Sequence, residues 1–173
     1  MTAKRKSTGR GLLARLEVLE TKEEARREEA RAANWELLQR ARAMLSPADR
    51  LAFDDACILA EEDPTPENLP LMGRMEAECK ALGLTEGPSI SHPAKKEALA
   101  WEPITADNDG AKPLSPPPAG RVADFRAYFE LCALWCEEEA ARPDFSEDLR
   151  RLARWGAALW RFEANLCQIL GGS

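Results

Sequence analysis

Apolar residues recur at alternating spacings of three and four positions through residues 121–170, which is the pattern of two core-facing helices. The apolar stripe of the first helix consists of Val122, Phe125, Phe129, Cys132 and Cys136. The stripe of the second consists of Leu152, Trp155, Leu159, Phe162, Leu166 and Ile169. Most of the chain's aromatic residues lie in this stretch. Because large rings dominate core energetics, we expect the main core here.

The short connection between these two helices predicts an antiparallel hairpin. Pro143 ends the first helix, and either Asp144 or Ser146 caps the second; Asp144 also stands at capping-box spacing from Glu147. Gly156 is costly inside a helix, so it either permits the close approach of another backbone or is simply tolerated. The apolar faces are too wide for the pair to cover, so a further helix must pack on them. That helix comes from the N-terminal half or from another chain.

Residues 11–45 predict one long helix that is apolar at both ends and charged in the middle. Pairs such as Glu23 with Arg27 stabilise the exposed middle by a few tenths of a kcal/mol each. A leucine stripe at the end of a charged helix should not remain in water. It is expected to dock on another copy, on a partner or on the protein's own body. The predicted partner-contacting residues of this tip are Leu12, Leu13, Leu16 and Leu19.

Two shorter helices follow, over residues 46–63 and 65–83. Ser46 caps the first, and Pro47 occupies its first turn, where the missing N–H costs no hydrogen bond. With the long helix they make a predicted N-terminal helical unit over residues 11–84.

The segment over residues 85–120 holds most of the prolines and predicts a Pro/Gly/Ser-rich irregular linker. A helical turn or two ending at Trp101 interrupts it. A single tryptophan in a polar linker pins that linker to a surface, either the protein's own core or a partner, and Trp101 is included among the predicted partner contacts.

The expected fold is therefore all-α, a bundle of about five helices. It has a long N-terminal helix, a proline-rich linker and a C-terminal aromatic hairpin over residues 121–173. Residues 1–10 are expected to form a disordered basic arm, and the hairpin is expected to pack with residues 11–84.

Charge is unevenly distributed along this chain, whose net charge is −6. The N-terminal arm is basic, and three arginines share an arc of the last helix opposite its apolar side. The candidate nucleic-acid contacts are Lys4, Arg5, Lys6, Arg10, Arg15, Arg150, Arg154 and Arg161. The alternative readings are a solvated arm and a solvent-facing helix surface partly paired with Glu137 and Glu138.

Several chemistries find no support in the sequence. Five cysteines without a Cys-x-x-Cys pair, together with one histidine, His92, indicate reduced thiols in a cytoplasm and no zinc site. Glycine-rich phosphate loops are missing, so no cofactor is expected. No apolar run has the length of a membrane span, and the N-terminus lacks the apolar core of a signal peptide.

Two acidic groups have spacing compatible with Mg²⁺ binding between helices. Glu17 and Glu20 form one, and the second consists of Asp54, Asp55, Glu61 and Glu62. A solvated face is the favoured reading of both. Glu163 falls within the apolar arc of the last helix, which places it at an edge or an interface.

These patterns predict a non-enzymatic helical assembly or adaptor protein. It acts through self-association or partner docking by the N-terminal helix, and a homo-oligomer is expected. The alternative is a nucleic-acid-binding accessory subunit of a phage or mobile-element DNA machine, acting through the basic arm. A remote third hypothesis is a Mg²⁺-dependent all-α nucleotide pyrophosphohydrolase.

Overall fold

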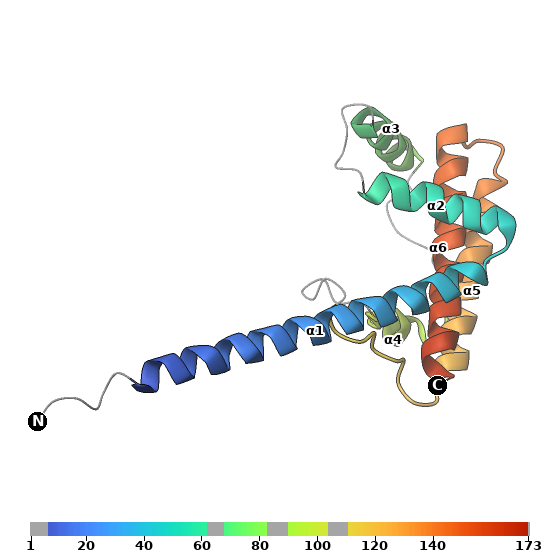
Figure 1. The fold of residues 1–173 in the computed structure, drawn as a ribbon. Helices are drawn as coiled ribbons and strands as arrows, with labels where there is room; N and C mark the ends of the chain where they lie inside the picture. Colours follow the sequence, from blue (N-terminus) through green and yellow to red (C-terminus); the bar gives the residue numbers. More distant parts are fainter. Residues whose placement is uncertain (1–6, 62–67, 83–89, 104–110, 173) are drawn as a thin grey trace, which may run out of the picture.

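The computed structural model describes residues 7–61, 68–82, 90–103 and 111–172, and within them the chain is all-α, without strands. The helices are α1 Ser7–Ala43, α2 Pro47–Glu61, α3 Asn68–Ala81, α4 Lys95–Leu99, α5 Val122–Ala140 and α6 Glu147–Gly171. Figure 1 shows α1 projecting from a body made by the other five. The predicted all-α class is confirmed, and the sixth helix is the short α4 inside the predicted linker.

The predicted start of the first helix was too late. Because α1 begins at Ser7, the residues from Ser7 to Arg10 continue the helix, whereas we had assigned them to a disordered arm; residues 1–6 lie outside the described part. The third helix begins at Asn68, later than predicted, so Pro70 falls in its first turn, where a missing N–H costs no hydrogen bond.

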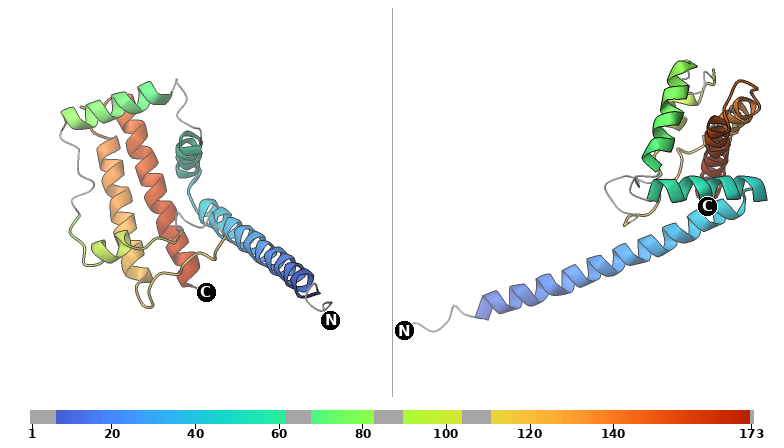
Figure 2. Two further views of the ribbon diagram at one scale, coloured as in Figure 1. Left: turned by 90° about the vertical axis from the view of Figure 1, so that its left-hand side faces the viewer. Right: turned by 90° about the horizontal axis from the view of Figure 1, so that it is seen from above.

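Helices α5 and α6 form the predicted hairpin, side by side over their length (Figure 2). The α5 residues Phe125, Tyr128 and Phe129 are buried against Ala164 and Cys167 of α6. Aromatic contacts add to this burial: the rings of Phe129 and Trp160 stack at 5.8 Å. The main core therefore lies where the aromatic pattern placed it.

Gly156 lies on α6 where a side chain would collide with α5. A Cβ atom at this position would lie 2.9 Å from Sγ of Cys136, nearer than real side chains come. The predicted close approach of another backbone is not what Gly156 permits: the atom it leaves room for is the side-chain sulfur of Cys136 on α5.

The first turn of α6 is capped by Ser146, whose hydroxyl accepts a hydrogen bond from the backbone N–H of Leu149 at 3.2 Å. The capping box between Asp144 and Glu147 was wrong. The carboxylate of Asp144 instead accepts two hydrogen bonds from Arg142, at 3.0 and 2.7 Å.

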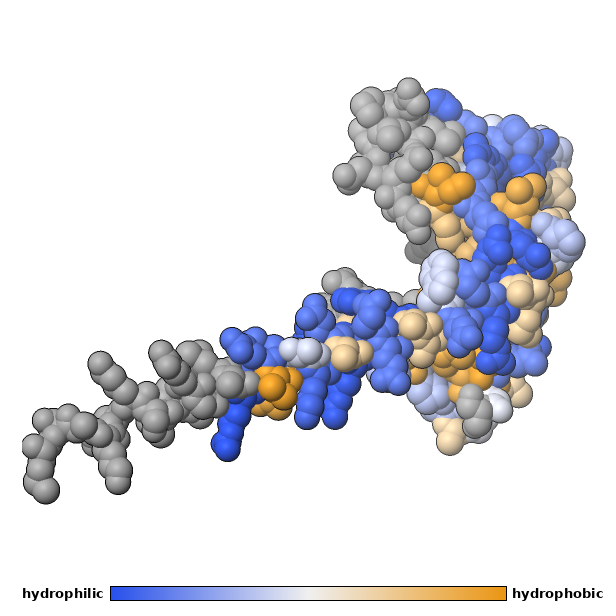
Figure 3. All heavy atoms as spheres, viewed as in Figure 1, coloured by the Kyte–Doolittle hydropathy of each residue, from blue (hydrophilic) through white to orange (hydrophobic). Residues whose placement is uncertain are grey.

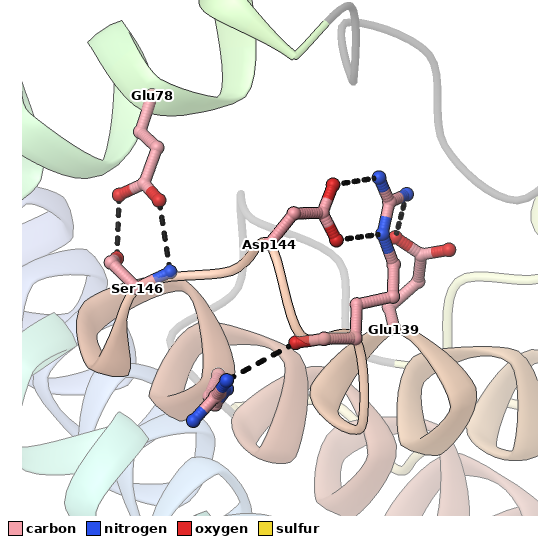
Figure 4. A network of polar contacts seen from close by, with 6 residues as sticks. Glu78, Glu139, Asp144 and Ser146 are labelled. Carbon is pink, nitrogen blue, oxygen red and sulfur yellow. Dashed lines mark hydrogen bonds and ion pairs between the residues drawn. The ribbon is translucent and has the colours of Figure 1, made fainter.

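Figure 4 shows how α3 is fixed to this cap. The carboxylate of Glu78 accepts hydrogen bonds from the backbone N–H and the hydroxyl of Ser146, at 3.0 and 2.5 Å. Met75 of α3 packs against Phe145 and Leu149 in the same region. A carboxylate and a small apolar cluster thus hold α3 at the N-terminal end of α6.

Helix α6 is the common partner of the N-terminal helices. Ala41 near the end of α1 and Leu45 just after it pack against Phe162 and Leu166. The ring of Phe53 in α2 stacks on Phe162 at 4.5 Å. The helices that cover the hairpin therefore come from the same chain, which was one of the two predicted sources. The division into four segments stays a prediction, because shared packing on α6 does not delimit domains.

Helix α6 buries two separate faces, one against α5 and one against α1 and α2. The strip between them is partly open, which corrects the predicted single stripe: Leu152 is 38% exposed and Leu159 is 43% exposed. Glu163 lies on the same strip by helical spacing and is half-buried, as expected of a residue at an edge.

Trp101 lies against the protein's own core. Its ring contacts those of Phe125 and Phe129 at 6.2 and 6.1 Å, and its indole N–H donates to the backbone carbonyl of Ser115 at 3.2 Å. Its assignment as a partner contact is therefore corrected: the alternative, a linker pinned to its own core, describes its position.

Candidate partner-docking surfaces

Helix α1 has 37 residues, a rise of about 55 Å, and most of it is not packed against the body. Arg15 and each residue from Glu17 to Glu29 are exposed, and the first buried residue is Asn34. Among the predicted contacts, Leu19 is 62% exposed. Leu12, Leu13 and Leu16 belong to the same helix, but their side chains lie outside the described part of the structure.

Two kinds of contact fix the C-terminal end of α1. The apolar packing of Ala41 and Leu45 is joined by a hydrogen bond from the Asn165 side chain to the Ala41 carbonyl at 3.2 Å. Asn34 adds a second pair: its amide donates to the carbonyl of Lys112 at 2.7 Å and accepts from the N–H of Leu114 at 3.1 Å. The helix is anchored at its C-terminal end, and its residues from Glu17 to Glu29 are exposed.

A second exposed apolar surface lines a hollow of about 560 Å³ between α2 and α6. Leu51 and Ile58 form its α2 wall and are 74% and 56% exposed, and Trp155 contributes from α6. Figure 3 shows apolar surface over α2 and also on the projecting part of α1, which is otherwise hydrophilic. Sequence reasoning missed this site. The sequence does contain a sign of it: Leu51 and Ile58 are seven positions apart on α2, beside the residues of that helix that face the core.

An ion pair forms part of the wall of this hollow. Arg151 donates two hydrogen bonds to the Asp55 carboxylate, at 2.8 and 2.7 Å, and the indole N–H of Trp155 donates a third at 2.8 Å. The Arg151 hydrogen bonds hold the pKa of the Asp55 carboxyl below its usual range, against the raising effect of burial. The neighbouring Asp54 is bonded to Arg42. Both carboxylates of the predicted solvated acidic face are thus paired with arginines, while their side chains stay 37% and 38% exposed.

The arginines of α6 that were candidate nucleic-acid contacts bond to acceptors within the protein. Arg161 bridges two helices, donating to Asp49 at 2.8 Å and to Glu137 at 2.6 Å. Arg154 pairs with Glu147 at 2.5 Å. These bonds agree with the alternative given for the three arginines, a solvent-facing helix surface that is partly paired with acidic residues across the hairpin.

Of the remaining candidates for nucleic-acid contact, only Arg15 and Arg150 have described side chains. Arg150 donates to the backbone carbonyl of Arg142 at 3.3 Å, and Arg15 is exposed on α1. Arg10 belongs to α1, but its side chain is not described, and Lys4, Arg5 and Lys6 lie outside the described residues.

Several ionisable groups of the hairpin are buried or half-buried. Burial raises the pKa of the Cys136 and Cys167 thiols to about 11, so both stay protonated at neutral pH. Burial also raises the pKa of Glu163. Within the described ranges no three His, Cys, Asp or Glu residues come together in a way that would hold a metal ion, and Glu17 and Glu20 are exposed on α1.

Within the residues that the structure describes, no helix has the length and apolar character that crossing a membrane requires. The chain matches no protein-family model, no curated protein and no solved structure.

Proposed function

We propose that this protein is a non-enzymatic assembly or adaptor protein that presents the free end of α1 to another protein chain. The observation that carries the proposal is the exposure of Val18 and Leu19, 53% and 62%, on a helix segment with no packing against the body. Exposed apolar residues on a projecting element are typical of a protein-binding site.

The energetics of α1 support this proposal. A solvated helix gains only a few tenths of a kcal/mol from each ion pair such as Arg27 with Glu23, whose side chains are both more than half exposed. Amphipathic helices obtain most of their stability from packing an apolar face. A partner that covers Leu19 would supply the packing that the body of this protein does not.

Several carboxylates and arginines of the body pair with each other across helices, which fits a scaffold better than a catalytic site. Asp55 holds α2 to α6 through Arg151, and Arg161 ties α2 and α5 to α6. These bonds position the helices around α6 and leave α1 as the element that reaches outward.

Light scattering coupled to size-exclusion chromatography of the full chain tests the proposal. We expect a mass that rises with concentration and a dissociation constant at least about tenfold higher in Leu19→Glu, because the burial of one leucine is worth more than one decade of affinity. Thr21→Glu places the same charge on the opposite side of α1 by helical spacing, and is the matched control.

Unchanged association of the Leu19→Glu variant would refute docking through this helix. A wild-type monomer at every concentration would remove self-association. The proposal would then require a partner protein whose capture by the full chain is lost in Leu19→Glu and retained in Thr21→Glu.

A further inference from the structure

We propose that the hollow between α2 and α6 receives the free end of α1 from a second copy of this chain. The inference rests on the proposed function and names both the partner and the surface that the partner offers. Three observations carry it: the reach of α1, the apolar spacing of the two surfaces and the distribution of charge around them.

The free end of α1 cannot reach the hollow of its own molecule. The helix runs without interruption to Ala43, and Leu19 is separated from that end by a rise of about 36 Å. Both views in Figure 2 show α1 leading away from α2 and α6. Folding back would break the helix, so an α1 end in the hollow comes from another molecule.

The apolar residues on the two surfaces have the same repeat. Leu51 and Ile58 are seven residues apart on α2, and Leu12 and Leu19 are seven residues apart on α1, with Leu16 between them. Helices whose apolar residues share a seven-residue repeat interdigitate along a common seam. The hollow beside Leu51 and Ile58 offers the space that such side chains need.

Charge around the hollow is divided between its walls. The α2 wall supplies the carboxylates of Asp54 and Asp55, which pair with Arg42 and Arg151, and the α6 wall supplies the guanidinium groups of Arg151 and Arg154. Arg154 and its partner Glu147 are both at least half exposed, so this arginine can exchange its acceptor at little cost.

The free end of α1 has the matching arrangement. By helical spacing Arg15 and Lys22 lie on one flank of the leucine stripe, and Glu17 and Glu20 lie on the other. All four side chains are exposed. Docked with its basic flank toward α2 and its acidic flank toward α6, the helix meets opposite charge on both walls. Such exposed pairs add little affinity but select one orientation.

An interface between a helix end and a hollow is heterologous, because each copy offers two different surfaces. Such contacts produce a ring, an open chain or, when two copies exchange helices, a closed pair. In each arrangement the α1 of one copy fills the hollow of the other. A variant with a blocked helix end and a variant with a blocked hollow should therefore still bind each other when mixed.

The test uses three full-length variants in size-exclusion chromatography with light scattering. Leu19→Glu blocks the helix end, and the double variant Leu51→Glu/Ile58→Glu blocks the hollow; these positions are exposed, so the fold should tolerate them. Leu134→Glu on α5, 50% exposed, is the control. Helicity and the urea midpoint of each variant establish that it is folded.

We expect each blocked variant alone to be a monomer at concentrations where the wild type and Leu134→Glu associate. Mixed together, the two blocked variants should form a one-to-one dimer and nothing larger, because one intact helix end and one intact hollow remain. The dissociation constant of this dimer should be close to that of a single wild-type contact.

A folded hollow variant that associates like the wild type would overturn this inference, while a loss of association in Leu19→Glu alone would leave the proposed function standing. A mixture without dimer, or a wild type that stays monomeric, would also overturn it. Unchanged association of both variants would reject the inference together with the proposed function.

Discussion

The side-chain amide of Asn34 accepts a hydrogen bond from the backbone N–H of Leu114, eighty positions further along the chain. The same side chain donates to the carbonyl of Lys112, and Asn34 is only 4% exposed. One polar residue thus satisfies two backbone groups of the proline-rich segment and joins that segment to α1 where the helix leaves the body.

We therefore expect Asn34→Ala to lower the free energy of unfolding by about 1–3 kcal/mol, because a buried backbone N–H and a carbonyl lose their partners. Urea unfolding followed by circular dichroism measures this. Asn34→Asp keeps the acceptor for Leu114 but places a buried carboxylate against the carbonyl of Lys112, so it should also be less stable than the wild type at neutral pH. Alanine at the adjacent Trp35, which is 64% exposed, should cost much less; an equal cost would argue against the hydrogen bonds.

Gly156 and Gly73 should respond in opposite ways to alanine. At Gly156 the new methyl group would lie 2.9 Å from the Cys136 sulfur, so overpacking of about 1–3 kcal/mol should outweigh the gain of about 1 kcal/mol in helix propensity. At Gly73, in α3, a Cβ meets no atom within 4 Å, so Gly73→Ala should stabilise by up to about 1 kcal/mol. Adding Cys136→Ala to Gly156→Ala should restore part of the loss, whereas a stabilising Gly156→Ala would contradict the close approach.

Asp55 should contribute to loss of stability in acid. Its folded-state pKa is lowered by the hydrogen bonds from Arg151, so its contribution is complete above the unfolded value near 4 and is lost as pH falls toward the lowered value. Asp55→Asn should reduce stability at pH 7 by about 1 kcal/mol or less, given the exposure of the pair. Its stability should then fall less than that of the wild type from pH 5 to about pH 2, as measured by urea titration. Parallel curves for the two proteins would contradict this.

Glu163 should change the stability of the protein with pH in the opposite direction to Asp55. Burial raises the pKa of this carboxyl in the folded protein, so the wild type is more stable when it is protonated and loses that stability as pH rises through the folded-state value. Glu163→Gln should be more stable than the wild type at neutral pH, with a difference that shrinks toward pH 4. Glu138→Gln, on the exposed side of α5, is the control. A Glu163→Gln variant that is less stable at neutral pH would indicate a needed carboxylate.

The spacing of apolar residues was enough to predict most of the helices. It was much less informative about the hollow between α2 and α6. The spacing around Phe125, Phe129 and Phe162 placed the hairpin and its core, since a helix with a 3.6-residue period must bury the face on which such rings recur. The spacing also predicted that Leu19 docks on another copy, on a partner or on the protein's own body, and its 62% exposure shows that the body does not cover it. Leu51 and Ile58 were missed as a separate surface. They lie beside the buried apolar residues of α2, so the sequence alone suggests one continuous apolar face.

The sequence by itself determined the helices, their approximate ends, the hairpin and the contrast between a charged shaft and an apolar tip, because these follow from spacing, capping and proline along a continuous chain. Only the tertiary structure decided that α6 buries two faces, that Trp101 turns inward, that Asp55 meets Arg151 and that a hollow remains between α2 and α6. Each of those outcomes depends on which distant segments compete for the same surface of α6, and periodicity within one helix contains no information about its neighbours.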